Sequence, residues 1–434
     1  MTMPMDRTDP VVHVVGAGLA GLSAATALVD RSIPVRIYEA APRAGGRCRS
    51  WHDEQLGCVI DNGNHLMLSG NHAVMAWLTT LGAGERLTGP ARAVFPFLDL
   101  ESGRRWTLDL GAGRWPGWLF DRARRIPDLG AFSHLRLVRR LMRAAPETPV
   151  AALAGADSPE MRFFLEPFTV AVLNRAPEDA AVGLLQPVLR ETVLKGGAAC
   201  RPRIARHSLE DTLVVPALER LKRAQTPIHF ARRIRRIVRE GGRVRALDTA
   251  GERITLGERD HLLLAVPQHA ARRLLPALPA PADGEAIVNL HFRLAHPPFG
   301  AGVHLYGLIG GLAQWVFARD ALVSVTISAA DDLLDRGADE LARQVYSEIS
   351  RLWRHDATPA ANKLPPYRVI KEKRATFAAD ADALGNRPGP HPLPLEAANL
   401  WLAGDWTATG LPATIESAVR SGLTAARHIA ADLR

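Results

Sequence analysis

The hydrophobic pattern near the start of the chain changes its period at a glycine-rich turn. Residues 11–15 form a short apolar run, which is typical of a buried strand. From 19 to 31 Ala and Leu recur at helical spacing, and a second strand-like segment, Val-Arg-Ile-Tyr, covers 35–38. This order of strand, helix and strand predicts a βαβ unit and a parallel sheet. The stretch 11–29 is long enough to cross a bilayer, but its central glycines favour a strand, a turn and a buried helix.

The rest of the chain mixes helical and strand patterns. Residues 81–203 are mostly helical in pattern, with interruptions by Pro and Gly. The predicted strands that follow are 228–238, 243–248, 253–256, 261–265, 286–292, 322–327 and 400–403. The predicted helices are 338–353 and 415–433, and the Pro-rich stretch 388–394 is predicted to be a loop.

Composition narrows the class of protein. Of the 434 residues 47% are hydrophobic and 23% are charged, which excludes a disordered chain and a small disulfide scaffold. The three cysteines, Cys48, Cys58 and Cys200, form no CxxC pair and favour a reducing compartment. Residues 1–10 lack a signal-peptide pattern, so a cytoplasmic protein is expected.

The formal charge of +9 comes mainly from Arg, which clusters at 122–125 and 232–236. Such a surface suits nucleic acid, anionic lipid or phosphate ligands. No nucleic-acid motif accompanies the charge, so no nucleic-acid partner is predicted. An Arg-rich face that is merely solvated explains the charge equally well.

The strongest local signal is the turn between the first strand and helix. It reads Gly16-Ala17-Gly18-Leu19-Ala20-Gly21. In such GxGxxG loops the glycines allow a tight turn, close approach of a pyrophosphate and close helix packing. Glu39 follows at the customary distance of about 20 residues and is placed to bind a ribose. The turn predicts a dinucleotide; a glycine turn used only for packing is the alternative.

Two further motifs resemble those of one flavoprotein family. Directly after Glu39 and Ala40 comes Arg43-Ala44-Gly45-Gly46-Arg47, which resembles the RxGGR signature of the amine oxidase and desaturase flavoproteins. Near the end of the chain, Gly404-Asp405 follows a strand and Thr414-Ile415 opens a helix. In that family the matching Gly-Asp meets the ribityl or phosphate part of FAD, and the helix start faces the flavin ring.

A narrower likeness is carried by less common motifs. They are Asp61-Asn62-Gly63-Asn64-His65, Gln314-Trp315-Val316-Phe317, Lys371-Glu372-Lys373-Arg374-Ala375-Thr376-Phe377 and Gly404-Asp405-Trp406-Thr407. Together they resemble the hydroxysqualene dehydroxylases, the squalene-associated FAD-dependent desaturases of hopanoid-making bacteria. The likeness runs over nearly the whole chain, although Asn64 stands where Gln is more usual.

The resemblance implies a fold and a division of the chain. The expected fold is α/β, with a Rossmann-like FAD-binding domain and a discontinuous, mixed α+β substrate domain. The FAD domain would collect 10–80, 205–270 and 395–434, and the substrate domain 81–204 and 271–394. Asn62, Gly63 and Asn64 are expected beside the flavin, and Ile234 beside the adenine. No metal site is predicted.

The resemblance also implies a reaction. FAD would reduce hydroxysqualene, a long apolar isoprenoid, to squalene. His65 is the candidate general acid for the departing hydroxyl group, because a His can titrate near neutral pH; a purely structural His65 is the alternative. Glu372 and Arg374 are expected to form a structural ion pair. No second dinucleotide loop marks an electron donor, so the donor stays open.

The sequence also suggests a contact with the membrane and leaves three alternative functions open. Trp115, Trp118 and the Arg-rich segment to Arg143 suit a peripheral contact with the inner face of the plasma membrane; an ordinary amphipathic helix is the alternative. An oxidative carotenoid or phytoene-type desaturase, an amine oxidase and a flavin-free prenyl-binding escort protein of the same fold are the other candidates.

Overall fold

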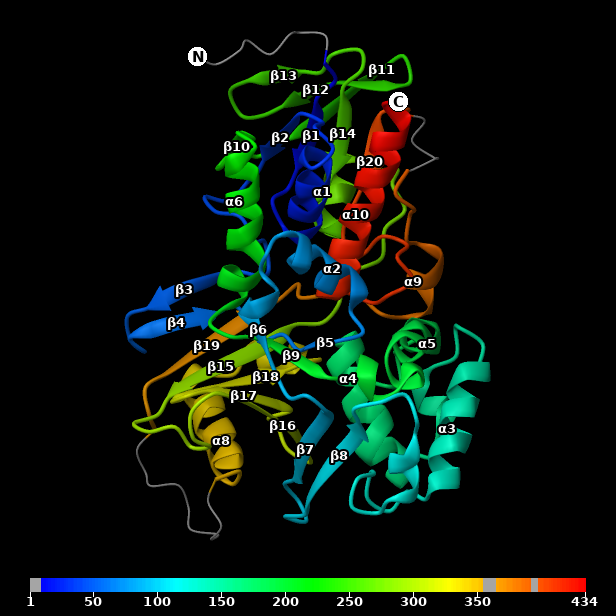
Figure 1. Ribbon diagram of the computed structural model, residues 1–434, viewed down its shortest axis with the longest axis vertical. Helices are drawn as coiled ribbons and strands as arrows, with labels where there is room; N and C mark the ends of the chain where they lie inside the picture. The colour runs from blue at the N-terminus through cyan, green and yellow to red at the C-terminus, as the bar shows by residue number, and fades with distance from the viewer. Residues whose placement is uncertain (1–8, 354–363, 392–396) are drawn as a thin grey trace.

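The computed structural model describes residues 9–353, 364–391 and 397–434. These residues form two bodies, an upper one and a lower one in Figure 1. The upper body contains both β1 (Val12–Val15) and the C-terminal helix α10 (Ile415–Asp432). The two ends of the chain therefore fold together.

The upper body is built on a five-stranded parallel sheet in the order β10-β2-β1-β14-β20. The other strands are β2 (Val35–Tyr38), β10 (Ile228–His229), β14 (His261–Leu264) and β20 (Leu400–Leu402). Strand β1 pairs with β2 on one side and with β14 on the other. Segments from the start, the middle and the end of the chain thus share one sheet, as the sequence predicts for a Rossmann-like domain.

Helices cover one face of this sheet and a small antiparallel sheet covers the other. The helices are α1 (Leu19–Val29), α2 (His72–Thr80), α6 (Val215–Arg223) and α10, which share one core with β1 and β2. The small sheet consists of β11 (Arg236–Glu240), β12 (Arg243–Asp248) and β13 (Arg253–Thr255). Ile237, Val244 and Leu247 of that sheet pack with Leu262 and Leu264 of β14.

The lower body centres on a seven-stranded mixed sheet in the order β19-β15-β18-β17-β16-β7-β8. Its strands are β7 (Ala93–Asp99), β8 (Arg105–Gly111), β15 (Ile287–Arg293), β16 (Val303–Ile309), β17 (Trp315–Arg319), β18 (Leu322–Ile327) and β19 (Tyr367–Glu372). Helix α8 (Ala338–Ser350) packs on one face of this sheet. The other face turns toward the loops that connect the two bodies.

Shorter elements connect the bodies and flank the lower sheet. The short strands are β3 (Ser50–Asp53), β4 (Cys58–Asp61), β5 (Met67–Leu68), β6 (Leu87–Thr88) and β9 (Pro202–Ala205). The remaining helices are α3 (Ala131–Arg143), α4 (Glu166–Leu173), α5 (Val182–Glu191), α7 (Gln268–Leu274) and α9 (Ala381–Gly385). Of these, α7 and α9 share a core with β14 and β20 of the upper body. No helix in the described part of the chain is long and apolar enough to cross a bilayer.

Two sequence-based expectations are wrong in part. The segment 81–203 is not mostly helical throughout, because 93–111 forms β7 and β8. Pro96 argues against a strand, yet it precedes the residues of β7 that pair with β16, so its missing N–H interrupts no bond there. The predicted strand 228–238 is two strands, β10 and β11, and Ile234 lies in the loop between them. Residues 392–394 of the predicted Pro-rich loop lie outside the described residues.

Candidate active site

The predicted glycine loop joins β1 to α1, and two of its glycines are required by the packing. Gly16 has a φ of 106°, and a Cβ there would lie 2.3 Å from the carbonyl oxygen of Ala265. A Cβ on Gly21 would lie 1.9 Å from the carbonyl oxygen of Gly16. Neither position can accept a side chain without moving the backbone.

Gly18 differs from these two, because it borders open space. Its backbone is extended, with φ −75° and ψ 180°, and a Cβ there would meet no atom within 4 Å. No side chain caps the helix that follows, and its first turn holds no acidic residue. The free N–H groups and the positive end of the helix dipole therefore fit a diphosphate.

The second glycine loop lies directly against the first. Gly45 forms a parallel bridge with Gly18, and its N–H donates to the carbonyl oxygen of Ala17 at 2.8 Å. Gly46 has a φ of 59°, and a Cβ there would meet only the Cα of Gly18, at 3.4 Å. The two loops together make a surface of backbone that a diphosphate can approach closely.

Glu39 lies at the end of β2 beside the first loop. Its two carboxylate oxygens accept hydrogen bonds from the N–H groups of Ala17, at 2.7 Å, and Ala41, at 2.8 Å. Each oxygen keeps a further lone pair that can accept a hydroxyl group of a ribose. The segment 231–232 runs alongside, since the N–H of Arg232 donates to the carbonyl oxygen of Glu39.

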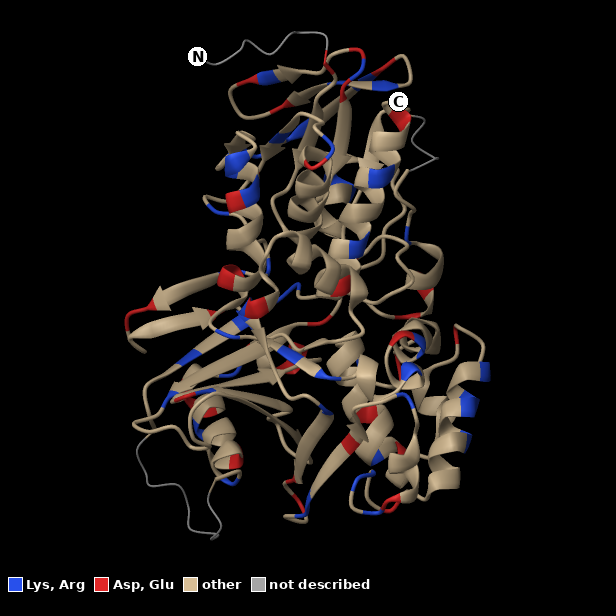
Figure 2. Ribbon diagram, viewed as in Figure 1, with Lys and Arg blue, Asp and Glu red and all other residues tan. Residues whose placement is uncertain are grey.

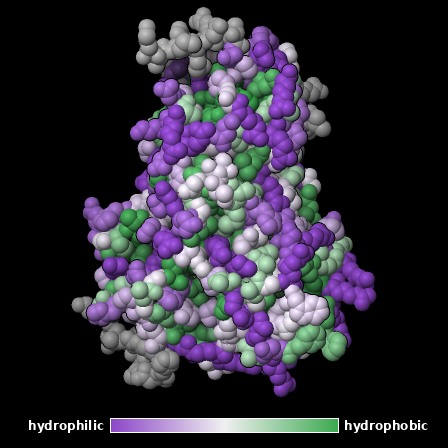
Figure 3. Space-filling view, in the orientation of Figure 1, coloured by the Kyte–Doolittle hydropathy of each residue, from purple (hydrophilic) through white to green (hydrophobic). Residues whose placement is uncertain are grey.

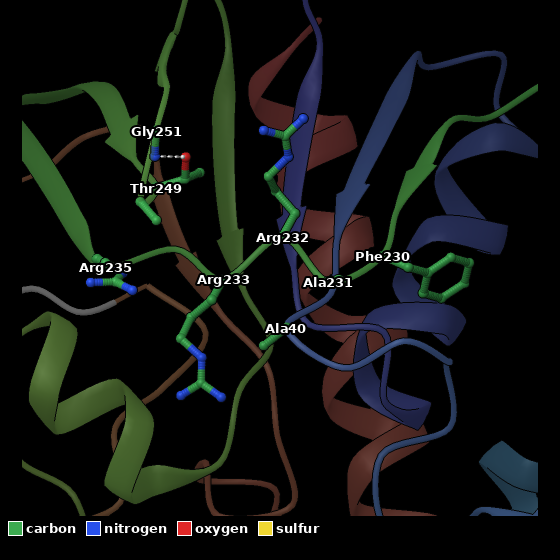
Figure 4. A pocket seen from close by; sticks show the side chains of 9 residues that line it. Ala40, Phe230, Ala231, Arg232, Arg233, Arg235, Thr249 and Gly251 are labelled. Carbon is green, nitrogen blue, oxygen red and sulfur yellow. Dashed lines mark hydrogen bonds between the residues drawn. The ribbon is translucent and has the colours of Figure 1, made fainter.

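An open pocket of about 450 Å³ adjoins this end of the site (Figure 4). Ala40, Ala231 and Arg233 are among the residues that line it, and Ile234 is buried next to them in the sequence. Arg43 is exposed and donates to the carbonyl oxygen of Ser50. It therefore links the second loop to β3, and its predicted contact with the cofactor stays a prediction.

The C-terminal motif closes on both loops. Asp405 is buried and forms an ion pair with Arg47, at 2.7 Å between the carboxylate and the guanidinium. Thr414 caps α10 by accepting from the N–H of Ser417, and Ile415 begins the helix. A Cβ on Gly422 would lie 2.2 Å from the carbonyl oxygen of Ala20, so α10 packs closely on α1. The three motifs predicted to hold one cofactor are thus in contact.

The segment 61–65 lies between the two bodies. Asp61 accepts from Ser50 Oγ at 2.6 Å and forms an ion pair with Arg319 of β17 at 2.5 Å. Asn62 donates to Glu372, at 3.1 Å. The ion-pair partner of Glu372 is Arg49, at 3.8 Å, and not Arg374 as the sequence suggested.

The next residues of this segment meet the lower sheet. A Cβ on Gly63 would lie 3.0 Å from the side-chain nitrogen of Asn289. Asn64 Nδ2 donates to Thr326 Oγ1 at 3.3 Å, and Thr326 in turn donates to Asn289 Oδ1 at 2.8 Å. Asn64 Oδ1 is buried and has no hydrogen-bond partner among the described residues.

His65 is half-buried and has no hydrogen-bond or ion-pair partner among the residues that the structure describes. Enclosure by protein atoms lowers the pKa of His65 to about 4; Asp61 opposes this shift and Arg47 adds to it. The ring is therefore neutral at pH 7 in this state, whereas the sequence-based hypothesis assumed a pKa near the working pH. Its freedom from partners argues against a purely structural role.

Three residues of the site were not found from the sequence. Arg319, Asn289 and Thr326 lie on strands whose apolar pattern indicates only core. The available signal was the alternation in 287–293 and 322–327, where polar residues occupy every second position. Such polar residues mark a sheet face that meets something other than an apolar core.

Comparisons with known proteins agree with this geometry. The model of the flavin-containing amine oxidoreductase family matches residues 19–430. A Rhodopseudomonas palustris protein named hydroxysqualene dehydroxylase is 45% identical over 96% of this chain and 97% of its own. A Sinorhizobium fredii protein of the same name is 42% identical over 96% of this chain and 97% of its own.

A solved structure shows the same fold. Cyclohexylamine oxidase from Brevibacterium oxydans superposes with a TM-score of 0.69, and the match covers 98% of this chain and 99% of that one. At 16% sequence identity this likeness concerns the fold alone. The glycine loops, the Arg47–Asp405 pair and these matches lead to one conclusion: the chain belongs to the flavin-containing amine oxidoreductase family and, within it, to the group of the hydroxysqualene dehydroxylases.

Proposed function

We propose that this protein reduces hydroxysqualene to squalene. The observation that carries the proposal is the match, over nearly the whole chain, to relatives named hydroxysqualene dehydroxylase. When bound, reduced FAD supplies the hydride that replaces the hydroxyl group and is itself oxidised. The C–O bond would break and a C–H bond would form, and the hydroxide would leave as water with the proton that two-electron-reduced FAD also carries, so that hydroxysqualene and FADH₂ give squalene, FAD and water. An external electron donor must reduce the flavin again.

The residues of the upper body are suited to hold FAD. The start of α1 and the two glycine loops would bind the diphosphate, with the charge of Arg47 nearby. Glu39 would accept hydrogen bonds from the ribose. Asp405 and the start of α10, at Thr414 and Ile415, would meet the flavin end of the cofactor.

The products formed from different substrates distinguish this proposal from its alternatives. The reduced, anaerobic holoenzyme is expected to form squalene from hydroxysqualene and to leave phytoene unchanged. Desaturated products from phytoene, or oxidation of an amine, would instead indicate one of the oxidative reactions of the family. A purified protein without flavin absorbance would favour the escort protein.

We propose that His65 donates a hydrogen bond from its neutral N–H to the departing oxygen. His65→Ala is expected to lower kcat by about 10²–10³, and His65→Gln, which keeps an N–H donor, by less. Because the pKa in the folded state lies below that of the unfolded chain, between pH 4 and 6.5 the unfolded state binds more protons. Stability therefore rises with pH in that window, and His65→Gln should weaken this dependence. Wild-type kcat in both variants would refute the assignment.

We also propose that the protein rests on anionic lipid through an apolar surface, the α3 face, made of Trp115, Phe120, Phe132 and Leu135. Trp115 and Phe132 are 81% and 78% exposed. Trp118, which the sequence suggested for this contact, is buried and packs edge-on against His134. In the space-filling view, hydrophobic side chains gather beside hydrophilic ones at the lower right, over the region of α3 (Figure 3).

Basic residues adjoin the α3 face. Helix α3 contains no acidic residue, and Figure 2 shows Lys and Arg along its outer edge. Among the described residues, Arg122, Arg136, Arg139 and Arg143 have no carboxylate within 4 Å. Apolar side chains flanked by unpaired guanidinium groups suit the surface of an anionic bilayer, which is also where a hydrocarbon substrate would dissolve.

Vesicle flotation tests the α3 face. The wild type is expected to float with phosphatidylglycerol vesicles and less with phosphatidylcholine vesicles. Trp115→Ser combined with Phe132→Ser should weaken this binding by at least about tenfold. Val59→Ser, which removes another exposed apolar side chain, serves as the control. Equal flotation of all variants, or none by the wild type, would exclude the membrane contact.

A further inference from the structure

One row of residues crosses six of the seven strands of the lower sheet, from β15 to β8, on the face away from α8. The pairing of strands places the members side by side, each opposite the next. In order from β15 to β8 they are Asn289, Thr326, Trp315, Gly307, Phe97 and Trp106, which we call the transverse row. Residues opposite one another on paired strands project from the same face of a sheet.

Ring contacts join the aromatic half of the transverse row. The rings of Phe97 and Trp106 stack with centroids 5.3 Å apart, and Phe97 meets Trp315 edge-on at 5.7 Å. A Cβ on Gly307 would lie 2.3 Å from the ring of Phe97, so the glycine makes room for that ring. From η4 (Met161–Leu165), Phe163 packs edge-on against Trp106 at 5.5 Å.

The opposite half of the row is polar and meets the segment 61–65. Asn289 and Thr326 bond one another, and Thr326 accepts from Asn64. Asn64 Oδ1 is the buried acceptor that lacks a partner among the described residues. A buried acceptor of this kind costs free energy unless a ligand supplies the missing donor.

Exposure distinguishes this row from the core on the other face. Val288, Leu290 and Val325, which point toward α8, are fully buried. Thr326, Trp315, Phe97 and Trp106 are all half-buried, although each pairs with a neighbouring strand of the sheet. Large apolar rings that retain access to solvent inside a molecule mark a place where an apolar ligand can be covered.

We propose that the transverse row binds one prenyl arm of the substrate, with its hydroxyl group at Asn64 and its hydrocarbon on Trp315, Phe97 and Trp106. This inference rests on the proposed function, since it identifies the binding surface of the same site. From Thr326 to Trp106 the row spans four strand spacings, or roughly 19 Å. The ligand class is a long allylic prenyl alcohol.

Binding of alcohols of increasing length tests the row without turnover. Geraniol, farnesol and geranylgeraniol are titrated into the oxidised holoenzyme, and the shift of the flavin absorbance reports binding. In the wild type each added isoprene unit is expected to tighten binding by at least about tenfold. Trp106→Ala should weaken the binding of geranylgeraniol by at least about tenfold and leave the binding of geraniol unchanged, because only the longer chain reaches that residue.

Further variants make the result decisive. Asn64→Leu should weaken the binding of all three alcohols by the same factor. Trp106→Phe should keep the increase of affinity with chain length. Trp353→Leu is the matched control, since Trp353 is a half-buried Trp packed with Phe299 and Tyr346 in the core on the α8 side. If Trp106→Ala and the control bind all alcohols equally, the row is not the binding surface, even though squalene formation would still support the function. If the alcohols bind as expected but no squalene forms, the function fails and the binding surface stands.

Discussion

Replacing Gly18 by Val is expected to abolish FAD binding and to leave the fold of the protein intact. The Cβ of a new side chain would meet no protein atom within 4 Å, and the extended backbone at this position accepts any residue. The open space beside Gly18 is where we propose that the diphosphate approaches the start of α1. Filling it should weaken FAD binding by about a hundredfold or more, with a stability change of the apoprotein below about 1 kcal/mol.

Gly337 provides a matched control for this substitution. It precedes α8 as Gly18 precedes α1, with φ −62° and ψ 143°, and a Cβ there also meets no atom within 4 Å. Gly337→Val should therefore purify with its full content of flavin. The ratio of flavin absorbance to protein and the thermal midpoint of each apoprotein are the measurements. A Gly18→Val protein that retains FAD would show that the diphosphate lies elsewhere.

Removing the guanidinium of Arg319 should lower the free energy of unfolding much more than removing that of an exposed Arg. Its partner Asp61 is only 1% exposed, and Arg319 itself 13%. Asp61 also accepts from Ser50 Oγ and from the N–H of Leu209, so its carboxylate joins β3, β4 and the segment before α6 to the lower sheet. Arg319→Met leaves this carboxylate buried without its cation, which costs about 3–5 kcal/mol of unfolding free energy.

An exposed ion pair is the control for that loss. Arg343 and Asp339 lie one turn apart on α8, with side chains 71% and 69% exposed. Arg343→Met should change the free energy of unfolding by less than about 0.5 kcal/mol, because water screens the pair. Denaturant unfolding of both variants gives the comparison. Equal, small losses would mean that Asp61 does not depend on Arg319.

The sequence predicts the upper body well, because its signals are local. The turn from 16 to 21 must be glycine-rich for steric reasons that act within a few residues, and the spacing to Glu39 follows from one βαβ unit. The motif Gly404-Asp405 could be assigned only through the family resemblance. Its contact with Arg47 joins opposite ends of the chain, and no periodicity reports a contact of that range.

The lower body is predicted less well, for the same physical reason. Strands β7 and β8 join a sheet whose other members come much later in the chain, so their pairing has no local signature. Pro96 and the neighbouring glycines suppress the strand signal that remains. The transverse row appears only when the register of all its strands is known, because its members are distributed over β15, β18, β17, β16, β7 and β8.

The pKa of His65 shows a further limit of reading the sequence. Residue type alone suggests an ordinary His, whereas enclosure by the fold lowers the pKa to about 4. The proposed role consequently changes from proton transfer by a charged ring to a hydrogen bond from a neutral one.

A single turnover in D₂O tests the central claim most directly. The holoenzyme is reduced anaerobically in D₂O, where N–H positions of the flavin exchange, and is then mixed with hydroxysqualene. The account predicts that one squalene forms for each flavin reoxidised and that each squalene carries one deuterium at the carbon that lost oxygen. Squalene without deuterium, or flavin that stays reduced while hydroxysqualene disappears, would contradict hydride transfer from the cofactor held between the two ends of this chain.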